Sequence, residues 1–489
     1  MITGGWLISA KLPGFARGRV LRVLERHFGA DLQVQKLDVR FFPTVQVRGE
    51  GLVFRQKGRP DAPPLITILE FSASTSITGA LHTPPRVQQV RLEGLRIQVS
   101  RRGPDVPHAK KTGGKRVPDF VLENVAADGT TLTVFPKDER KQPLEFDIRR
   151  LQLWSAGTVA PMSFRATLTN AKPPGDIQTT GKFGPWDRED VGQTAVTGSY
   201  TFRDADLSVF RGITGKLASN GSYRGVLERI EVDGWTDVPD FTVKVSGNPV
   251  DLKTRFHAIV DGTDGDTLLQ PVEAQFGNSH VTAHGAVQGE KGVKGKTVAL
   301  DVVADGRVED MLHLATKGRE PPLNGAVRFQ SKLTIPPGDV DIAQKLELAG
   351  AFVIDSARFR KLDLQQKINA LSRKAKGKPG APPGGTVASD FAGNYALDQG
   401  VVTLRRFSFR IPGVALNLNG RYGLLNERLD FRGTAQLEAK VSETTTGFKS
   451  LLLKAVDPLF KRKNAGAVVP IKITGTRNQP QFGLDLHRF

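Results

Sequence analysis

Apolar residues recur at every second position over most of this chain, and this period constrains the fold more than any other feature. The alternation is clear in 95–99, 407–411, 414–418 and 482–486, and weaker versions fill much of the remainder. Each run is bounded by Gly, Pro, Asn or Asp, which are typical of tight turns. A period of two indicates strands with one apolar face. The sequence therefore predicts many antiparallel strands joined by short turns, each strand wet on its other side. Between Ile148 and Leu151 the alternation shifts, which predicts a bulge there.

Three stretches change to a helical period. Residues 14–28, 361–373 and 444–461 each place apolar side chains on one face of a helix. In the last stretch Pro458 is expected to kink or restart the helix. The predicted fold class is therefore mainly β: an elongated antiparallel β-groove, or an open sandwich, with about three short amphipathic helices. A sandwich with a filled core remains the alternative, because periodicity alone does not separate the two.

Breaks in the alternation suggest how the chain is divided. Residues 101–118 have no period and are predicted to be a basic flexible loop, and 373–386 is a Lys/Gly/Pro tract typical of a linker. The predicted segments are an N-terminal module (1–100), the basic loop (101–118), a central β-rich body (119–358), a helix with its linker (359–386) and a C-terminal region (387–489).

The formal charge of +19 is concentrated in four segments, and the rest of the chain is close to neutral. These segments are 11–26, 101–118, 358–378 and 449–463. Such patches suit anionic lipid headgroups or the phosphates of nucleic acid. Nucleic acid is the weaker interpretation, because stacking aromatics are missing: 101–118 contains none and 358–378 contains only Phe359. We therefore expect no nucleic-acid partner. The alternative for each patch is a solvated surface.

Motifs that carry chemistry are not found. The chain has no cysteine, which excludes thiolate metal sites and disulfides and is compatible with an oxidising compartment. His280 and His284 have the spacing of a metal pair on a helix, but their context predicts a strand, where they would lie roughly 13 Å apart. The acidic run 261–266 (DGTDGD) departs from the spacing of a calcium loop and is interpreted as a polar turn. We expect no catalytic residue, metal or cofactor, and no enzymatic activity.

Motifs near both ends of the chain resemble the AsmA family of bacterial envelope proteins. The N-terminal block contains RFFPTVQVRGEGLVFRQKG (40–58), PPLITILEFSASTSITGAL (63–81) and VQQVRLEGLRIQV (87–99). The C-terminal block contains FRIPGVALNLNGRYGLLNERLDFRG (409–433) and a helical stretch that leads into PIKITGTRNQPQF (470–482). Residues 119–370 are similar mainly in strand rhythm.

The resemblance implies an apolar β-groove related to bridge-like lipid-transfer proteins. It implies a role in phospholipid transport or outer-membrane assembly, with phospholipid, a membrane and envelope proteins as partners. Family members are periplasmic and anchored in the inner membrane by an N-terminal helix. Residues 1–10 are apolar but too short to span a bilayer, so we expect either an anchor helix that this chain does not contain or a member of the family that associates with the membrane peripherally. The alternative function is a ligand-free structural or interaction protein of the envelope.

Three groups of candidate site residues follow. Residues expected to line the lipid groove are Leu95, Ile97, Val99, Phe407, Phe409, Ile411, Leu416 and Leu418. Residues expected on a helix that acts as a plug or a gate are Phe448, Leu451, Leu452 and Leu459. Residues expected to contact lipid headgroups are Arg17, Arg19, Arg22, Lys461, Arg462 and Lys463.

Overall fold

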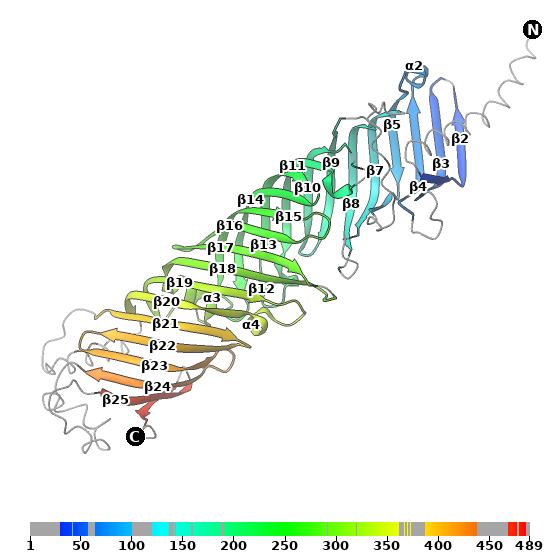
Figure 1. Cartoon of the computed structure of the whole chain (residues 1–489). Coiled ribbons are helices and arrows are strands. Elements are labelled where there is room, and N and C mark those ends of the chain that lie inside the picture. The colour runs from blue at the N-terminus through cyan, green and yellow to red at the C-terminus, as the bar shows by residue number, and fades with distance from the viewer. Residues whose placement is uncertain are drawn as a thin grey trace, which may run out of the picture.

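The computed structural model of this chain is one continuous sheet of 26 strands (Figure 1). It describes residues 30–485 apart from 42, 57–63, 100–119, 136–140, 142, 158–159, 186, 188–189, 291, 319, 361–365, 367–368, 370–371, 373–386, 438–467 and 477–478. The first and last strands lie at opposite ends of an elongated molecule. The mainly β fold class predicted from the sequence is confirmed.

The strands follow one another along the sheet in chain order. The first half of the sheet is formed by β1 (Ala30–Gln33), β2 (Lys36–Arg40), β3 (Val45–Gln56), β4 (Ile66–Thr75), β5 (Arg86–Glu93), β6 (Arg96–Val99), β7 (Val121–Val134), β8 (Leu144–Ala156), β9 (Met162–Ala171), β10 (Pro174–Phe183), β11 (Ala195–Asp206), β12 (Ile213–Thr214) and β13 (Lys216–Val226). The second half is formed by β14 (Arg229–Val243), β15 (Pro249–Val260), β16 (Thr267–Phe276), β17 (Ser279–Gly289), β18 (Lys296–Arg307), β19 (Leu323–Ile335), β20 (Glu347–Phe359), β21 (Ser389–Asp398), β22 (Val401–Ile411), β23 (Val414–Gly423), β24 (Arg428–Leu437), β25 (Val468–Thr476) and β26 (Pro480–Leu484).

Short helices interrupt the sheet at its rims. They are α2 (Ile77–Leu81), α3 (Val308–Ala315) and α4 (Ile342–Lys345), with two 3-10 turns, η1 (Val191–Gln193) and η2 (Leu207–Val209). None of them coincides with a helix predicted from the sequence. Of the predicted helices, 14–28 and 444–461 lie outside the described residues. Within 361–373 the described residues are Gln366, Asn369 and Ser372, and all three are helical.

Neighbouring strands are antiparallel with one exception. Strands β5 and β6 both pair with β7 in parallel, within a sheet whose other strand pairs are antiparallel. The physical reason is the long connection before β7: parallel neighbours need a crossover of about a dozen residues or more, and the chain supplies it between Val99 and Val121. The sheet also continues from β20 to β21 across the predicted linker.

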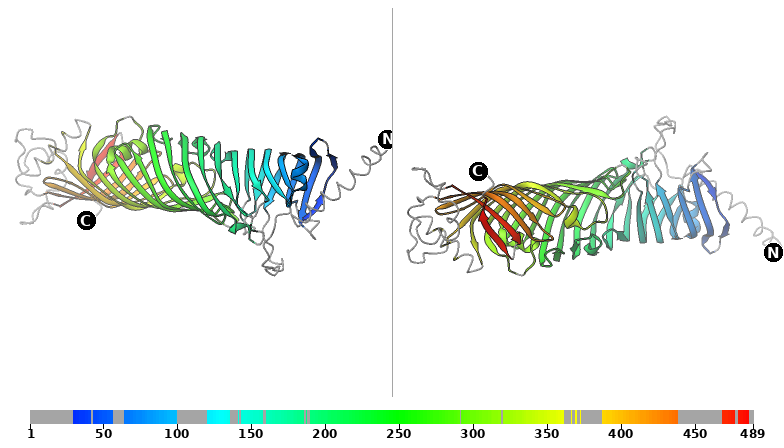
Figure 2. Two further views of the ribbon diagram at one scale, coloured as in Figure 1. Left: turned by 90° about the horizontal axis from the view of Figure 1, so that it is seen from above. Right: turned by 90° about the horizontal axis from the view of Figure 1, so that it is seen from below.

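Register shifts bend the sheet at many places. One lies between Ile148 and Arg150, where the sequence predicted a bulge, and others interrupt most pairs from β14 to β23. A bulge adds one residue on one strand and increases the local right-handed twist. Seen from above and below, the sheet accordingly curls along its length (Figure 2).

Candidate functional site

One face of the sheet carries uninterrupted rows of uncharged side chains. In the first row each residue is the direct cross-strand partner of the next, from β2 to β25, and none is exposed to solvent. The row is Val39, Val47, Ala73, Val90, Val125, Leu153, Phe164, Gly181, Gly198, Tyr223, Val232, Ala258, Leu269, Gly285, Leu300, Leu333, Leu348, Leu397, Val402, Tyr422, Leu429 and Gly475.

A second row runs beside the first, two residues away on each strand except β16, where a register shift makes the step from Leu269 to Val272 three residues. Its members are Leu37, Gly49, Phe71, Leu92, Ala127, Leu151, Ala166, Thr179, Tyr200, Gly221, Gly234, Phe256, Val272, Ala283, Val302, Ser331, Gly350, Tyr395, Leu404, Gly420, Phe431 and Ile473. It too contains no charged residue and no exposed one. We call the face that carries these rows the uncharged face.

The opposite face is polar and exposed. His284 faces Asp301 across strands β17 and β18, His280 faces Asp305, and the His257 ring lies 2.9 Å from an Asp233 carboxylate oxygen. His280 and His284 are therefore strand residues, as the sequence predicted, and the structure places both on the wet side. This alternation gives the sheet one dry and one wet face.

Aromatic rings on the uncharged face lie across glycines of the neighbouring strand. A Cβ atom added at any of these glycines would collide with the ring, so the ring occupies the space that a side chain would fill. The pairs of glycine and ring are Gly49 with Phe71, Gly198 with Tyr223, Gly221 with Tyr200, Gly234 with Phe256, and Gly420 with Phe431. Because these rings lie along the backbone, they line the uncharged face without filling the space in front of it.

Among the described residues, the hydrophobic clusters on this face join neighbouring parts of the sheet. One cluster combines β1 to β8 around Leu52, Phe54 and Ala127, and another combines α3 with β19 to β21 around Val327 and Ile354. In the described part of the chain, no cluster joins strands from distant parts of the sheet as the core of a sandwich does. The uncharged face is therefore an extended half-buried surface.

The residues predicted to line a groove fall on this face in two separate places. Leu95 and Ile97 belong to the cluster around Phe54, and Val99 is half-buried beside Val134 on β7. The second group lies far along the sheet, on β22 and β23. There Phe407, Phe409, Ile411 and Leu416 form one cluster, and Leu418 is buried opposite Phe407.

The aromatic side chains of that second group stack on one another. The Phe391 ring centroid lies 4.8 Å from that of Phe409 and 6.0 Å from that of Phe407. Phe352 approaches Phe407 from β20, with 6.2 Å between centroids. The helix residues Phe448, Leu451, Leu452 and Leu459 and the six basic residues predicted to contact headgroups lie outside the described residues.

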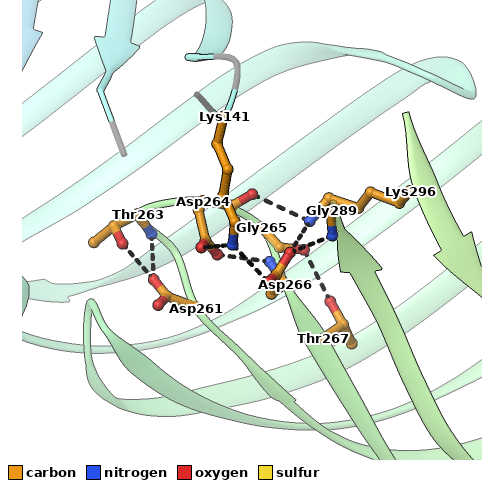
Figure 3. A network of polar contacts seen from close by, with 9 residues as sticks. All are labelled: Lys141, Asp261, Thr263, Asp264, Gly265, Asp266, Thr267, Gly289 and Lys296. Atoms are coloured by element: carbon orange, nitrogen blue, oxygen red, sulfur yellow. Dashed lines mark hydrogen bonds and ion pairs between the residues drawn. The ribbon is translucent and has the colours of Figure 1, made fainter. Parts of the chain in front are cut away.

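The acidic run 261–266 is a polar turn between β15 and β16, as predicted, and it contacts a distant hairpin (Figure 3). The Lys141 ammonium, from the β7–β8 hairpin, pairs with Asp264 and with Asp266, at 2.5 and 2.8 Å. Lys296 reaches the other Asp266 oxygen at 2.9 Å, and the Gly289 N–H donates to that same oxygen. We call this network the hairpin clamp. The carboxylates of Asp264 and Asp266 are thus already paired with the ammonium groups of Lys141 and Lys296, with which a metal cation would have to compete.

Side chains in the hairpin clamp are largely buried, and both burial and hydrogen bonds shift the pKa values of Lys141 and Asp266. The Lys141 side chain is 18% exposed and that of Asp264 15%. Burial opposes the charged form of Lys141, and hydrogen bonds from its ammonium to both aspartates reverse this, so the pKa of Lys141 is raised. Burial likewise opposes ionisation of Asp266, but its hydrogen bonds from Lys141, Gly289 and Lys296 lower its pKa.

Asn248 is a buried polar residue that the sequence did not single out. Its Nδ2 lies 3.0 to 3.1 Å from the carbonyl oxygens of His313, Thr316 and Gly318, so its two hydrogens are shared among three acceptors. These carbonyls lie at and beyond the C-terminal end of α3, where the helix leaves them without partners of its own. Asn248 thereby holds α3 on the rim. Only the three-dimensional contact reveals this role, since 65 residues separate Asn248 from His313.

Other kinds of site were sought in the same residues. Within the described ranges, no group of three or more His, Cys, Asp or Glu could hold a metal ion. A shallow pocket of about 440 Å³ beside the hairpin clamp is lined by Glu228, Arg229, Asp261 and neighbouring residues, on the rim of the sheet. Among the helices of the described residues, none combines the length and apolarity that a bilayer crossing demands. Comparison of the chain with family models, curated proteins and solved structures found no match in any of the three.

Proposed function

We propose that this chain is a lipid carrier of the bacterial envelope, whose uncharged face holds acyl chains during phospholipid transport or outer-membrane assembly. The observation that carries this proposal is the pair of uncharged rows that runs from β2 to β25. The envelope location and an inner-membrane anchor rest on the resemblance of the terminal motifs to the AsmA family.

The length of the rows favours an extended surface along which a lipid moves, which we call the lipid track, over a pocket for a single ligand. Neighbouring strands lie about 4.8 Å apart, so a row across 22 strands measures about 100 Å along the sheet. That is several times the roughly 30 Å hydrocarbon core of a bilayer. A lipid held on such a surface meets another uncharged contact at the next strand, which suits movement along the sheet.

The energy of moving an acyl chain explains why such a surface is needed. Each methylene exposed to water costs roughly 0.8 kcal/mol, so a sixteen-carbon chain costs on the order of 12 kcal/mol. A continuous uncharged row, in which most of the larger side chains are aliphatic or aromatic, removes much of that cost, whereas a single charged residue in the row would restore it locally. The function needs no catalytic group.

Neither row contains a basic residue, which favours an arrangement in which the acyl chains of the lipid lie on the uncharged face and its headgroup stays in water. A lipid phosphate buried on this face would meet no lysine or arginine in either row. Burying an unpaired charge costs several kcal/mol, so the phosphate stays at the open side, in water. The proposal therefore concerns acyl chains and is neutral about headgroup identity.

A matched pair of substitutions on β18 tests the proposal. Leu300 belongs to the first row, and Val303 lies on the polar face, 50% exposed. Leu300→Asp should slow phospholipid transfer between two vesicle populations at least tenfold, and Val303→Asp should leave the rate unchanged. Both variants are first checked for the circular dichroism of the parent protein. If Leu300→Asp unfolds the protein, Leu300→Gln replaces it.

The outcomes separate the carrier from a ligand-free structural protein. Organic extraction of the purified parent protein should release phospholipid. If the parent protein neither carries lipid nor accelerates transfer, the uncharged face is a surface for another protein and the proposed function is wrong.

A further inference from the structure

The uncharged face changes character over strands β10 to β15. Elsewhere its larger side chains are mostly aliphatic or aromatic, but here hydroxyl groups on adjacent strands gather in one patch. We call this patch the hydroxyl belt, and its members are Thr179, Tyr200, Ser219, Tyr223, Thr236 and Thr254. Four glycines of the two rows fall among them, so the belt is lined by flat rings and bare backbone.

The direction of the hydrogen bonds can be assigned at both tyrosines. The Thr179 hydroxyl donates its single hydrogen to the Ser199 carbonyl, at 2.9 Å, so the Tyr223 hydroxyl 2.7 Å away must donate to Thr179. In the same way Ser219 donates to the Trp235 carbonyl at 3.0 Å, and Tyr200 donates to Ser219 at 3.1 Å. Both tyrosine hydrogens are thus committed to the protein.

What the two tyrosines still offer is an acceptor oxygen. A phenol oxygen that has given its hydrogen keeps lone pairs, and no donor among the described residues bonds to either one. Burial raises the pKa of Tyr200 and of Tyr223 above the ordinary value, in agreement with their half-buried positions. In the free protein water can donate to a half-buried acceptor, and a ligand that covers the oxygen must bring a donor of its own or leave the oxygen buried without one.

The lack of charged residues in the hydroxyl belt indicates that the hydrogen-bond donor of the ligand is a neutral group. Each belt residue is neutral, and so are its neighbours in the two rows, Gly198 and Gly221. An ammonium placed there would be desolvated without a carboxylate to pair with, at a cost of several kcal/mol that a hydroxyl does not incur. The complementary group is therefore a neutral hydroxyl, flanked by apolar chain that lies on the rows to either side.

We propose that the hydroxyl belt is a station on the lipid track that binds a free hydroxyl at the junction between acyl chain and headgroup. This rests on the proposed function and names the class of lipid held best there: one with a free glycerol hydroxyl, such as a monoacyl phospholipid. One hydrogen bond from that hydroxyl to Tyr200 or Tyr223 strengthens binding about threefold to tenfold.

The test uses two lipids that differ by one donor. Lysophosphatidylcholine carries its one free hydroxyl at the second glycerol carbon, and its 2-O-methyl ether has the same chain and headgroup without any hydroxyl donor. The parent protein should bind the hydroxyl lipid about threefold to tenfold more tightly. Tyr200→Phe with Tyr223→Phe should abolish the preference by weakening only the hydroxyl lipid, because both rings remain over their glycines.

Tyr422→Phe is the matched control, since Tyr422 lies on the same face outside the belt, on β23. It should keep the full preference. Two results would overturn the hydroxyl belt as a binding station: equal affinity of the parent protein for the two lipids, or a preference that survives in the double variant. Either result leaves the proposed function standing. If the parent protein binds neither lipid, the proposed function fails and this inference fails with it.

Discussion

The hairpin clamp gives the sharpest prediction about stability, through substitution of Lys141. Lys141→Met removes two ion pairs and leaves Asp264 without its ammonium partner. An exposed pair contributes at most about 1 kcal/mol, and breaking a fully buried one costs about 3–5 kcal/mol. The side chains of Lys141, Asp264 and Asp266 are 15–21% exposed, so we expect a loss of about 1–3 kcal/mol, confined to the contact between hairpin and turn.

Hydrogen exchange measures this loss locally, without unfolding the whole chain. Amides at the adjoining ends of β7 and β8, such as Val134 and Phe146, should exchange about 5-fold to 100-fold faster in Lys141→Met. Lys332→Met, on the polar face of β19, is the control and should change nothing. A double-mutant cycle with Asp264→Asn should give a coupling of about 1–2 kcal/mol. A coupling below about 0.3 kcal/mol would refute the clamp as a stabilising contact.

The hairpin clamp also predicts a pH range over which its contribution to stability is constant. The pKa of Asp266 is lowered, so its contribution is complete above the ordinary value of 3.8 and is lost as pH falls through the lowered pKa. The pKa of Lys141 is raised, so its contribution is complete below the ordinary value of 10.5 and is lost as pH rises through the raised pKa. Protection of the hairpin, corrected for intrinsic exchange, should stay constant between about pH 5 and 9. A titration inside that range would contradict the assignment.

Two further substitutions test packing at the rim and on the uncharged face. Asn248→Ala leaves three carbonyls at the end of α3 without their donor and should destabilise α3 by about 2–4 kcal/mol, seen as faster exchange of its amides. Gly198→Ala forces its Cβ into the Tyr223 ring and should cost about 1–3 kcal/mol, whereas Gly289→Ala, which meets only an Asp266 oxygen at 3.7 Å, should cost less than about 1 kcal/mol. Denaturant midpoints of Gly198→Ala and Gly289→Ala measure this difference in stability, and equal midpoints would contradict the prediction.

Local patterns in the sequence predicted the strands and their apolar side. A period of two is a property of a few neighbouring residues, so it identified 407–411 and 414–418 and placed Phe407 and Leu418 on one face. The bulge after Ile148 was predictable for the same reason, because it breaks the alternation within one strand.

Features that depend on distant residues were not predictable. Lys141 and Asp264 are 123 residues apart, and nothing near either of them indicates the other. The overlay of Tyr223 on Gly198 depends on the register between two strands, which alternation alone does not determine. Helix α3 was missed because its eight residues show too few turns for a helical period to emerge.

Photocrosslinking tests the central claim most directly: that acyl chains lie on the uncharged face. A phosphatidylglycerol with a photoreactive group on its acyl chain is loaded onto the protein, and adducts are mapped by peptide mass spectrometry. We expect adducts at Leu300, Leu333 and Leu348, three neighbours in the first row, and none at Asp301 or Lys332 on the polar face. Adducts spread equally over both faces, or no adducts on the row, would contradict the account.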